Sequence, residues 1–193
     1  MTVFPLPPGS TIGILGGGQL GRMLAMAAAR LGFDVAILEP QAGSPAARVA
    51  AHSIEAAYDD PEGLARLAAL SEVITYEFEN VPAAAVARLA ALGATAAPGE
   101  RALATAQDRL TEKAFLNAAG APTVAFAAVD GPEDLSRAIA QVGLPLLLKT
   151  RRGGYDGKGQ AWVRTAGDAG SALQSLGGEG LIAEAAAPFV REL

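Results

Sequence analysis

The first half of the chain alternates between two spacings of apolar residues. Short runs of consecutive apolar residues predict buried β-strands, and apolar residues that recur every three or four positions predict helices with one packed face. The expected strands are 11–15, 34–38 and 72–76, and the expected helices are 20–31, 62–70 and 83–92. Because strands and helices alternate in this way, we expect an open, parallel, Rossmann-like α/β domain over residues 1–98.

Residues at the ends of these helices support the assignment. Asp60 precedes Pro61, which is the usual order of an N-cap and a first helical residue. Gly32 follows the first helix, at a position where the chain often turns left-handed and glycine is favoured.

The pattern changes after the turn at Pro98-Gly99, where we place a domain boundary. A helical run at 100–119 is expected to break near Asp108-Arg109. The remaining expected elements are strands at 124–129, 144–148, 160–164 and 181–184, with helices at 130–142 and 168–176. Residues 99–193 are therefore predicted to form a second, α+β segment.

Composition narrows the possible functions. Hydrophobic residues make up 51% of the chain, enough for a sizeable core, and the net charge of −5 argues against a nucleic-acid partner. The absence of cysteine excludes disulfides and thiolate zinc sites, and the single histidine, His52, is expected to be structural. Neither a signal peptide nor a membrane-spanning stretch is evident, so we expect a soluble cytoplasmic protein.

The stretch 144–160 carries the strongest chemical signal. An apolar run ends in Lys149, and four glycines follow within seven residues, at Gly153, Gly154, Gly157 and Gly159. Glycines let backbone N–H groups approach anionic oxygens, and nearby cations offset phosphate charge, so the loop suits a phosphate cradle. A hairpin turn with a solvated basic tip is the alternative. The loop is not a Walker A motif, because no G-K-[ST] opens a helix after it.

The local pattern also predicts how two arginines and a tryptophan near this loop are oriented. Arg151 and Arg152 are adjacent, so in an extended segment their side chains face opposite ways and at most one reaches a phosphate. Trp162, on the following strand, is expected in the core.

A second glycine motif lies near the N-terminus. Gly16, Gly18 and Gly21 match G-x-G-x-x-G between a strand and a helix, and Glu39 ends the next strand, where dinucleotide-binding folds place a ribose-binding carboxylate. This predicts NAD binding, but two alternatives remain. One is a tight turn without a ligand. The other is a helix N-terminus, around Gln19 and Leu20, that holds an anionic or polar substrate.

Three acidic residues follow predicted strands. Glu77 lies just after the strand at 72–76, where ligands bind in open α/β sheets, and it could accept hydrogen bonds from ribose hydroxyls or an amine. A solvated turn that caps the next helix is the alternative. Glu184 ends a later strand and Glu192 follows it, and either could contact a nucleoside or be an ordinary surface acid.

Four motifs together resemble a known family. They are GGGQLGRM at 16–23, TYEFENVP at 75–82, QDRLTEK at 107–113 and KTRRGGYDGKGQ at 149–160. In this order they resemble the N-terminal half of the 5-(carboxyamino)imidazole ribonucleotide synthases of the ATP-grasp superfamily. The resemblance implies an ATP-grasp ligase of purine biosynthesis. Such an enzyme phosphorylates bicarbonate with ATP and Mg²⁺, and then carboxylates 5-aminoimidazole ribonucleotide through carboxyphosphate.

The resemblance also implies roles for individual residues. The ATP phosphates would be contacted by Arg109 and Lys149, and the loop over the nucleotide would consist of Gly154, Tyr155, Asp156, Gly157, Lys158, Gly159 and Gln160. The adenine would be lined by Glu184, Ala185, Ala186 and Ala187, and Glu192 would hold the ribose. Tyr155 and Asp156 would lie between the nucleotide and the aminoimidazole as catalytic residues. The substrate-side contacts would be Gln19, Leu20 and Glu77.

Members of this family continue well beyond the length of this chain. We therefore expect the ATP-grasp segment to be incomplete, the Mg²⁺ ligands to lie downstream of residue 193, and the 193-residue chain to be inactive alone. No metal-binding residue is expected within it, and the full-length protein is expected to be a homodimer. The alternatives are a formate-dependent glycinamide ribonucleotide transformylase, an NAD(P)-dependent oxidoreductase, and a non-catalytic binding module.

Overall fold

A computed structural model describes residues 5–154 and 157–187 of the chain. The chain forms two compact units, Met1–Ala104 and Thr105–Leu193. The division lies within helix α4, Glu100–Ala106. The boundary expected between residues 98 and 99 lies a few residues earlier and stays a prediction.

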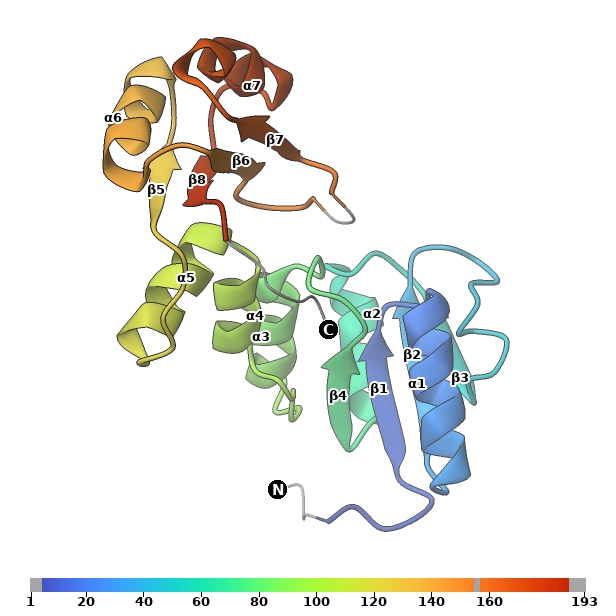
Figure 1. The fold of residues 1–193 in the computed structure, drawn as a ribbon. Helices are drawn as coiled ribbons and strands as arrows, with labels where there is room; N and C mark the ends of the chain where they lie inside the picture. Colours follow the sequence, from blue (N-terminus) through green and yellow to red (C-terminus); the bar gives the residue numbers. More distant parts are fainter. Residues whose placement is uncertain (1–4, 155–156, 188–193) are drawn as a thin grey trace. The chain divides into compact units, whose positions relative to one another are not determined.

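The first unit is built on a four-stranded parallel sheet of order β3-β2-β1-β4 (Figure 1). Its strands are β1 Thr11–Leu15, β2 Asp34–Glu39, β3 His52–Glu55 and β4 Val73–Tyr76. The open parallel sheet predicted for this half is therefore confirmed. Strand β3 is absent from the predicted elements, because this edge strand buries only Ile54 and its sequence shows no apolar alternation.

Helices cover both faces of this sheet. Successive side chains of a strand point to opposite faces, so β2 contributes Ala36 and Leu38 to one core and Val35 and Ile37 to another. The first core contains residues of α2, Pro61–Leu70, and α3, Ala83–Ala91, and the second contains residues of α1, Gln19–Arg30. As predicted, Asp60 caps α2 by accepting a hydrogen bond from the Gly63 N–H.

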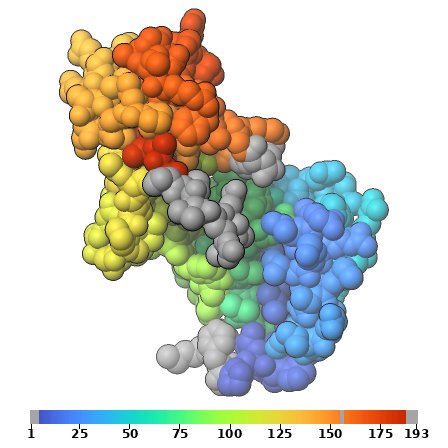
Figure 2. Space-filling model, viewed as in Figure 1, coloured from blue at the N-terminus to red at the C-terminus, as the bar shows by residue number. Residues whose placement is uncertain are grey.

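Helix α1 packs on the sheet through small residues. Its buried residues are Gly21, Ala25 and Ala28. Small side chains let the helix backbone lie close to β1 and β2, which brings the helix N-terminus near the ends of these strands. The outer side of α1 lies at the surface, in the blue part of Figure 2. The larger apolar side chains of α1 are exposed; they are Leu20, Met23, Leu24 and Met26.

The second unit contains an antiparallel sheet of order β5-β8-β6-β7. The strands are β5 Phe126–Val129, β6 Leu146–Thr150, β7 Gln160–Val163 and β8 Leu181–Ala185. The helices are α5 Arg109–Ala118, α6 Pro132–Val142, the short 3₁₀ helix Ala166–Asp168 and α7 Ala169–Ser175. Helices α6 and α7 share one core with alternate residues of β6, β7 and β8 (Figure 1).

The other face of this sheet carries the polar residues. Leu147 pairs with both Trp162 and Glu184, and directly paired residues point to the same face. Leu146 and Leu148 point to the helix-covered core instead. Trp162 is 43% exposed, so its predicted place in the core is wrong. It stacks with the Arg164 guanidinium, 5.0 Å from the ring centroid. None of the described helices has the length and apolar character needed to cross a membrane.

Candidate functional site

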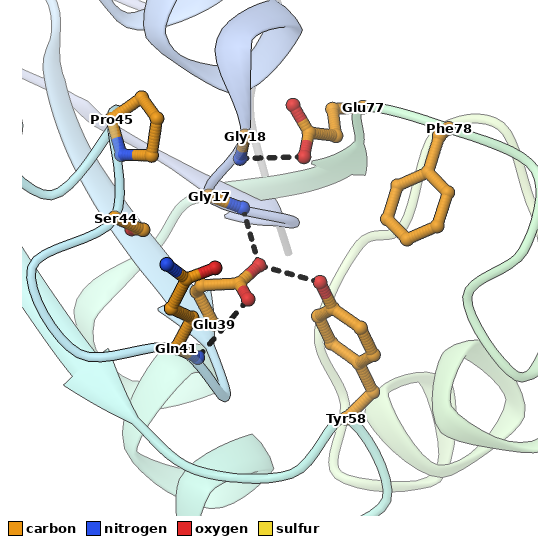
Figure 3. A pocket seen from close by; sticks show the side chains of 9 residues that line it. All are labelled: Gly17, Gly18, Glu39, Gln41, Ser44, Pro45, Tyr58, Glu77 and Phe78. Atoms are coloured by element: carbon orange, nitrogen blue, oxygen red, sulfur yellow. Dashed lines mark hydrogen bonds between the residues drawn. The ribbon is translucent and has the colours of Figure 1, made fainter.

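In the first unit, the candidate site lies where β1 ends between β2 and β4. The crossover from β1 to β2 runs over one face of the sheet, through α1, and the return to β4 runs over the other, through α2. Open α/β sheets bind ligands at such a reversal, beside the carboxyl ends of the strands. Three segments meet there: the glycine turn after β1, the end of β2 at Glu39, and Glu77 after β4 (Figure 3).

Glu77 caps the first helix, 59 residues away from it in sequence. Its carboxylate accepts a hydrogen bond from the Gly18 N–H at 2.7 Å and a second one from the Gly21 N–H. These are donors at the positive N-terminus of α1, which is left without a side-chain cap of its own. The alternative that Glu77 caps the following helix is wrong, because that helix has Pro82 at its N-cap and no side-chain cap.

Glu39 also accepts a hydrogen bond from the glycine turn. Its carboxylate accepts hydrogen bonds from the Gly17 N–H at 2.8 Å, the Gln41 N–H at 3.1 Å and the Tyr58 hydroxyl at 2.6 Å (Figure 3). Burial of Tyr58, together with its hydrogen bond to Glu39, raises the pKa of the phenol well above its usual range. Tyr58 is therefore a neutral donor at physiological pH.

The two carboxylates argue against a dinucleotide at this turn. A pyrophosphate would need the N–H groups that Glu39 and Glu77 already accept from, and its charge would be repelled by both. Beside them lies a cavity of about 250 Å³, lined by Gly17, Gly18, Glu39, Gln41, Ser44, Pro45, Tyr58, Glu77 and Phe78 (Figure 3). The buried Ser44 hydroxyl has no hydrogen-bond partner among the described residues. This cavity suits a ligand that presents hydrogen-bond donors or positive charge.

Gln19 and Leu20, the other predicted contacts in this unit, open helix α1 next to the cavity-lining Gly18. Both side chains are exposed, which leaves them accessible to a ligand.

In the second unit, Asp108 joins helix α5 to the base of the glycine-rich loop. The Asp108 carboxylate caps α5 through the N–H groups of Leu110 and Thr111. The same carboxylate pairs with the Arg151 guanidinium through two hydrogen bonds, of 3.1 and 2.8 Å. Burial alone would raise the pKa of Asp108, but the hydrogen bonds from Arg151 and the helix N–H groups outweigh it and lower that pKa below its usual value.

Arg109, which follows Asp108, also binds the glycine-rich loop. Its guanidinium donates hydrogen bonds to the carbonyl oxygens of Thr150, Gly153 and Gly154, at 2.8 to 2.9 Å. Its backbone N–H donates to the Arg151 carbonyl at 3.0 Å. The predicted contact of Arg109 with ATP phosphates stays a prediction.

Two glycines let the ends of the loop approach closely. A Cβ on Gly154 would lie 2.8 Å from the Lys158 carbonyl oxygen, and one on Gly159 would lie 2.7 Å from the Thr150 hydroxyl. The Thr150 N–H and the Gly159 carbonyl are hydrogen-bonded at 2.9 Å. The predicted loop residues Gly157, Lys158 and Gln160 lie within the same return to β7, and Tyr155 and Asp156 lie outside the described residues.

The two loop arginines do not face opposite ways. Arg152 Nε lies 3.6 Å from an Asp108 oxygen, on the same side as Arg151. The prediction assumes an extended segment, but the chain bends at these two residues. Asp108 thus draws both guanidinium groups toward itself.

Lys149 and Glu184 meet on the sheet face opposite to the one that α6 and α7 cover. Lys149 Nζ lies 2.9 Å from Glu184 Oε2, and Lys113 Nζ lies 3.6 Å from Glu184 Oε1. Glu184 is only 5% exposed, so its charge is compensated mainly by these two lysines. No sequence pattern assigns a role to Lys113, although its position four residues after Arg109 places both on one side of α5.

The remaining predicted nucleotide contacts follow Glu184. Ala185 ends β8, and its N–H donates to the Ala125 carbonyl at 2.9 Å. The Ala186 N–H donates to the Pro145 carbonyl at 3.3 Å, and Ala187 is the last described residue. Glu192 lies outside the described residues. Roles for these residues at an adenine or ribose stay predictions.

The described part of the chain does not offer a metal site. Within residues 5–154 and 157–187, no three Asp, Glu or His side chains are grouped so that they could hold a metal ion. The expected place of the Mg²⁺ ligands, downstream of residue 193, stays a prediction.

Comparison with known proteins identifies the family. Residues 10–107 match the model of the ribonucleotide synthetase preATP-grasp domain, which covers just over half of the chain. The chain belongs to the ATP-grasp ribonucleotide synthetases. Residues 114–193 match the model of the ATP-grasp domain itself. The ATP-grasp resemblance and the fold class expected from the motifs are thereby confirmed.

Several similar proteins are named as N5-carboxyaminoimidazole ribonucleotide synthases or synthetases. An N5-carboxyaminoimidazole ribonucleotide synthase of Brucella melitensis is 61% identical over 155 residues, which cover 80% of this chain and 42% of that protein. A solved N5-carboxyaminoimidazole ribonucleotide synthetase in complex with ADP is 42% identical, with a TM-score of 0.89, over 96% of this chain and 49% of that one.

A third relative was solved with two ligands. The N5-carboxyaminoimidazole synthase of Aspergillus clavatus, in complex with ADP and 5-aminoimidazole ribonucleotide, is 31% identical, with a TM-score of 0.83, over 95% of this chain and 48% of that one. The chain thus spans about half the length of the ATP-grasp ribonucleotide synthetases that it matches.

Proposed function

We propose that this chain supplies the ribonucleotide-binding unit and the first part of the ATP-binding unit of an N5-carboxyaminoimidazole ribonucleotide synthase. Such an enzyme uses ATP and bicarbonate to carboxylate the exocyclic amine of 5-aminoimidazole ribonucleotide. Support comes from the family matches, from relatives that carry this name, and from a related synthase that was solved with ADP and the ribonucleotide.

The observation that carries the proposal is the ionic cluster on the face of the second sheet opposite α6 and α7. Lys149 lies near the end of β6, just before the glycine-rich loop, and its ammonium lies 2.9 Å from the buried Glu184 carboxylate. A nucleotide on this face would have a cation for its phosphates and a carboxylate for the amino group of adenine within one site. Arg109 would add a second cation at the base of the loop.

The first unit would bind the hydrogen-bond donor groups of the ribonucleotide. Glu77 uses one lone pair of each oxygen on a helix N–H, so each oxygen can accept another hydrogen bond. Ribose hydroxyls or an amine would bind there, while the phosphate group would lie away from the two carboxylates. Gln19 and Leu20 at the start of α1 would make the neighbouring contacts.

The chemistry divides into two transfers. The bond from the γ-phosphorus of ATP to the bridging oxygen of ADP breaks, and a bond to a bicarbonate oxygen forms, which gives carboxyphosphate. The carboxyl carbon then separates from phosphate, as carbon dioxide, and bonds the exocyclic nitrogen, which releases one proton. The residues of this chain would contribute mainly positioning and charge stabilisation. Catalytic roles for Tyr155 and Asp156 and a ribose contact for Glu192 stay predictions, as does the homodimer.

Nucleotide binding tests the proposal in the second unit. We expect the 193-residue chain to bind ATP at millimolar concentration in preference to NADH, as measured by calorimetric titration. Lys149→Met should weaken ATP binding about tenfold or more, because a charge-assisted hydrogen bond is lost. Arg137→Met, which removes an exposed cation on α6, is the matched control and should leave binding unchanged. Binding of NADH but not ATP would overturn the proposal.

Ribonucleotide binding tests it in the first unit. Glu77→Gln should weaken binding of 5-aminoimidazole ribonucleotide about tenfold, because it removes one charged acceptor. Glu55→Gln, on the exposed side of β3, makes the same charge change as a control. If Glu77→Gln stays folded by circular dichroism and binds the ribonucleotide as wild type does, the substrate does not lie at this cavity.

A further inference from the structure

Glu184 is a buried carboxylate held between two lysines, although the proposed function needs one of them elsewhere. Its side chain is 7% exposed, and those of Lys113 and Lys149 are 17% and 24% exposed. The Lys149 contact is the shorter, at 2.9 Å against 3.6 Å for Lys113. If the Lys149 ammonium turns to a nucleotide phosphate, Glu184 loses its nearer partner.

A buried carboxylate that loses its partner is strongly disfavoured, so it would compete with the phosphate for Lys149. Lys113 is the second cation within reach of Glu184, and it comes from a different element, helix α5, so it need not follow Lys149. It contacts Oε1, whereas Lys149 contacts Oε2, and the two lysines therefore do not exclude each other. The arrangement allows one lysine to leave while the other stays.

We propose that Lys113 is a positioning residue that keeps Glu184 compensated and thereby releases Lys149 to bind the nucleotide phosphates. This inference rests on the proposed function for the site but assigns a role to a residue outside it. Lys113 acts through Glu184 and Lys149 rather than by touching the nucleotide. Its contribution should therefore appear only with ligands that carry phosphates and only while Glu184 is charged.

The ion pairs can be tested first without a nucleotide. The chain has only three lysines, Lys113, Lys149 and Lys158, so ¹³C,¹⁵N-lysine labelling gives three side-chain signals. Glu184→Gln should shift the signals of Lys113 and Lys149. An unchanged Lys113 signal would overturn the proposal, because the second ion pair would then be absent in solution.

Nucleotide titrations then test the release of Lys149. We expect Lys113→Met to raise the Kd for ATP about tenfold and to change the Kd for adenosine less than about twofold, because adenosine does not need Lys149. Lys113→Arg should bind ATP nearly as wild type does. Equal losses for ATP and adenosine would mean that Lys113 only supports the fold, and would overturn the proposal.

A double variant separates compensation from direct contact. In the Glu184→Gln background no carboxylate charge competes for Lys149, so adding Lys113→Met should change the Kd for ATP less than about threefold. A persistent tenfold loss would show that Lys113 contacts phosphate itself, and would refute the positioning role. A wild-type chain that binds no ATP would instead refute the proposed function, which distinguishes the two failures.

Discussion

Replacing Asp108 should release the base of the glycine-rich loop from helix α5 and destabilise the second unit. Asp108→Ala removes an N-cap, which contributes about 1 kcal/mol. It also removes the paired hydrogen bonds to Arg151, each of a kind that contributes about 1.5 kcal/mol or more when a charge takes part. The Arg151 side chain is 28% exposed, so its guanidinium is partly hydrated after the substitution. We therefore count the two hydrogen bonds together as about 1.5 kcal/mol. The sum is a loss of about 2–3 kcal/mol.

A second substitution separates the contribution of the N-cap from that of the ion pair. Asp108→Asn keeps a good N-cap and removes only the charge, so it should lose about 1–2 kcal/mol. Urea unfolding followed by fluorescence of Trp162, the chain's single tryptophan, reports on this unit. The control is the exposed Asp134–Arg137 pair of α6, where Arg137→Met should change stability by less than about 0.5 kcal/mol.

The stabilities contributed by Asp108 and Arg151 should depend on each other, because the two side chains form an ion pair. A double-mutant cycle with Asp108→Asn and Arg151→Met should give a coupling of about 1 kcal/mol or more, and a coupling near zero would refute the ion pair as a clamp.

The stability that Asp108 contributes should depend on pH with a definite sign. The pKa of Asp108 is lowered in the folded protein, so its contribution is present above the unfolded value of about 3.9 and is lost as pH falls through the folded value.

Two further predictions concern the first unit. Gly21→Ala should destabilise it by about 2 kcal/mol, because the new Cβ would lie 2.7 Å from the Gly16 carbonyl oxygen. Gly170→Ala, in open space on α7, should instead stabilise by about 0.5 kcal/mol, and thermal unfolding by circular dichroism compares the two. Tyr58 should ionise well above the usual range of a tyrosine in an ultraviolet pH titration, because burial and its hydrogen bond to Glu39 raise its pKa. Because its folded pKa is raised, stability should fall as pH rises above about 10, and Tyr58→Phe should abolish that part of the fall.

Local signals predict most of the secondary structure. The strand β1 and the break between α4 and α5 depend on neighbouring residues, and the cap at Asp60 lies three residues from its donor. The edge strand β3 escapes such signals, since its pairing with β2 depends on residues distant in sequence. Spacing predicts helix α1 but points to the wrong face of it, because the large apolar residues that recur, Leu20, Met23 and Leu24, are exposed. The packed face consists of the small residues Gly21, Ala25 and Ala28.

The site is less predictable than the fold. Motifs single out Lys149, Glu77 and Glu184, and the structure brings the first and last of these together. Which groups compensate Glu184 cannot be read from spacing, because Lys113 lies 71 positions before it in the numbering. The exposed position of Trp162 is also hidden in the sequence, since only the register of β6 with β7 decides which face it occupies.

The carboxylates of Glu39 and Glu77 also have a consequence for the kinetics of binding. They hold the glycine turn through its own N–H groups, so the turn needs no ligand to fix its conformation. A ligand that binds beside them contacts a preorganised surface, so ordering of the chain costs little of the binding free energy. Association at this cavity should therefore proceed in a single fast step, without the slow phase that loop closure would add.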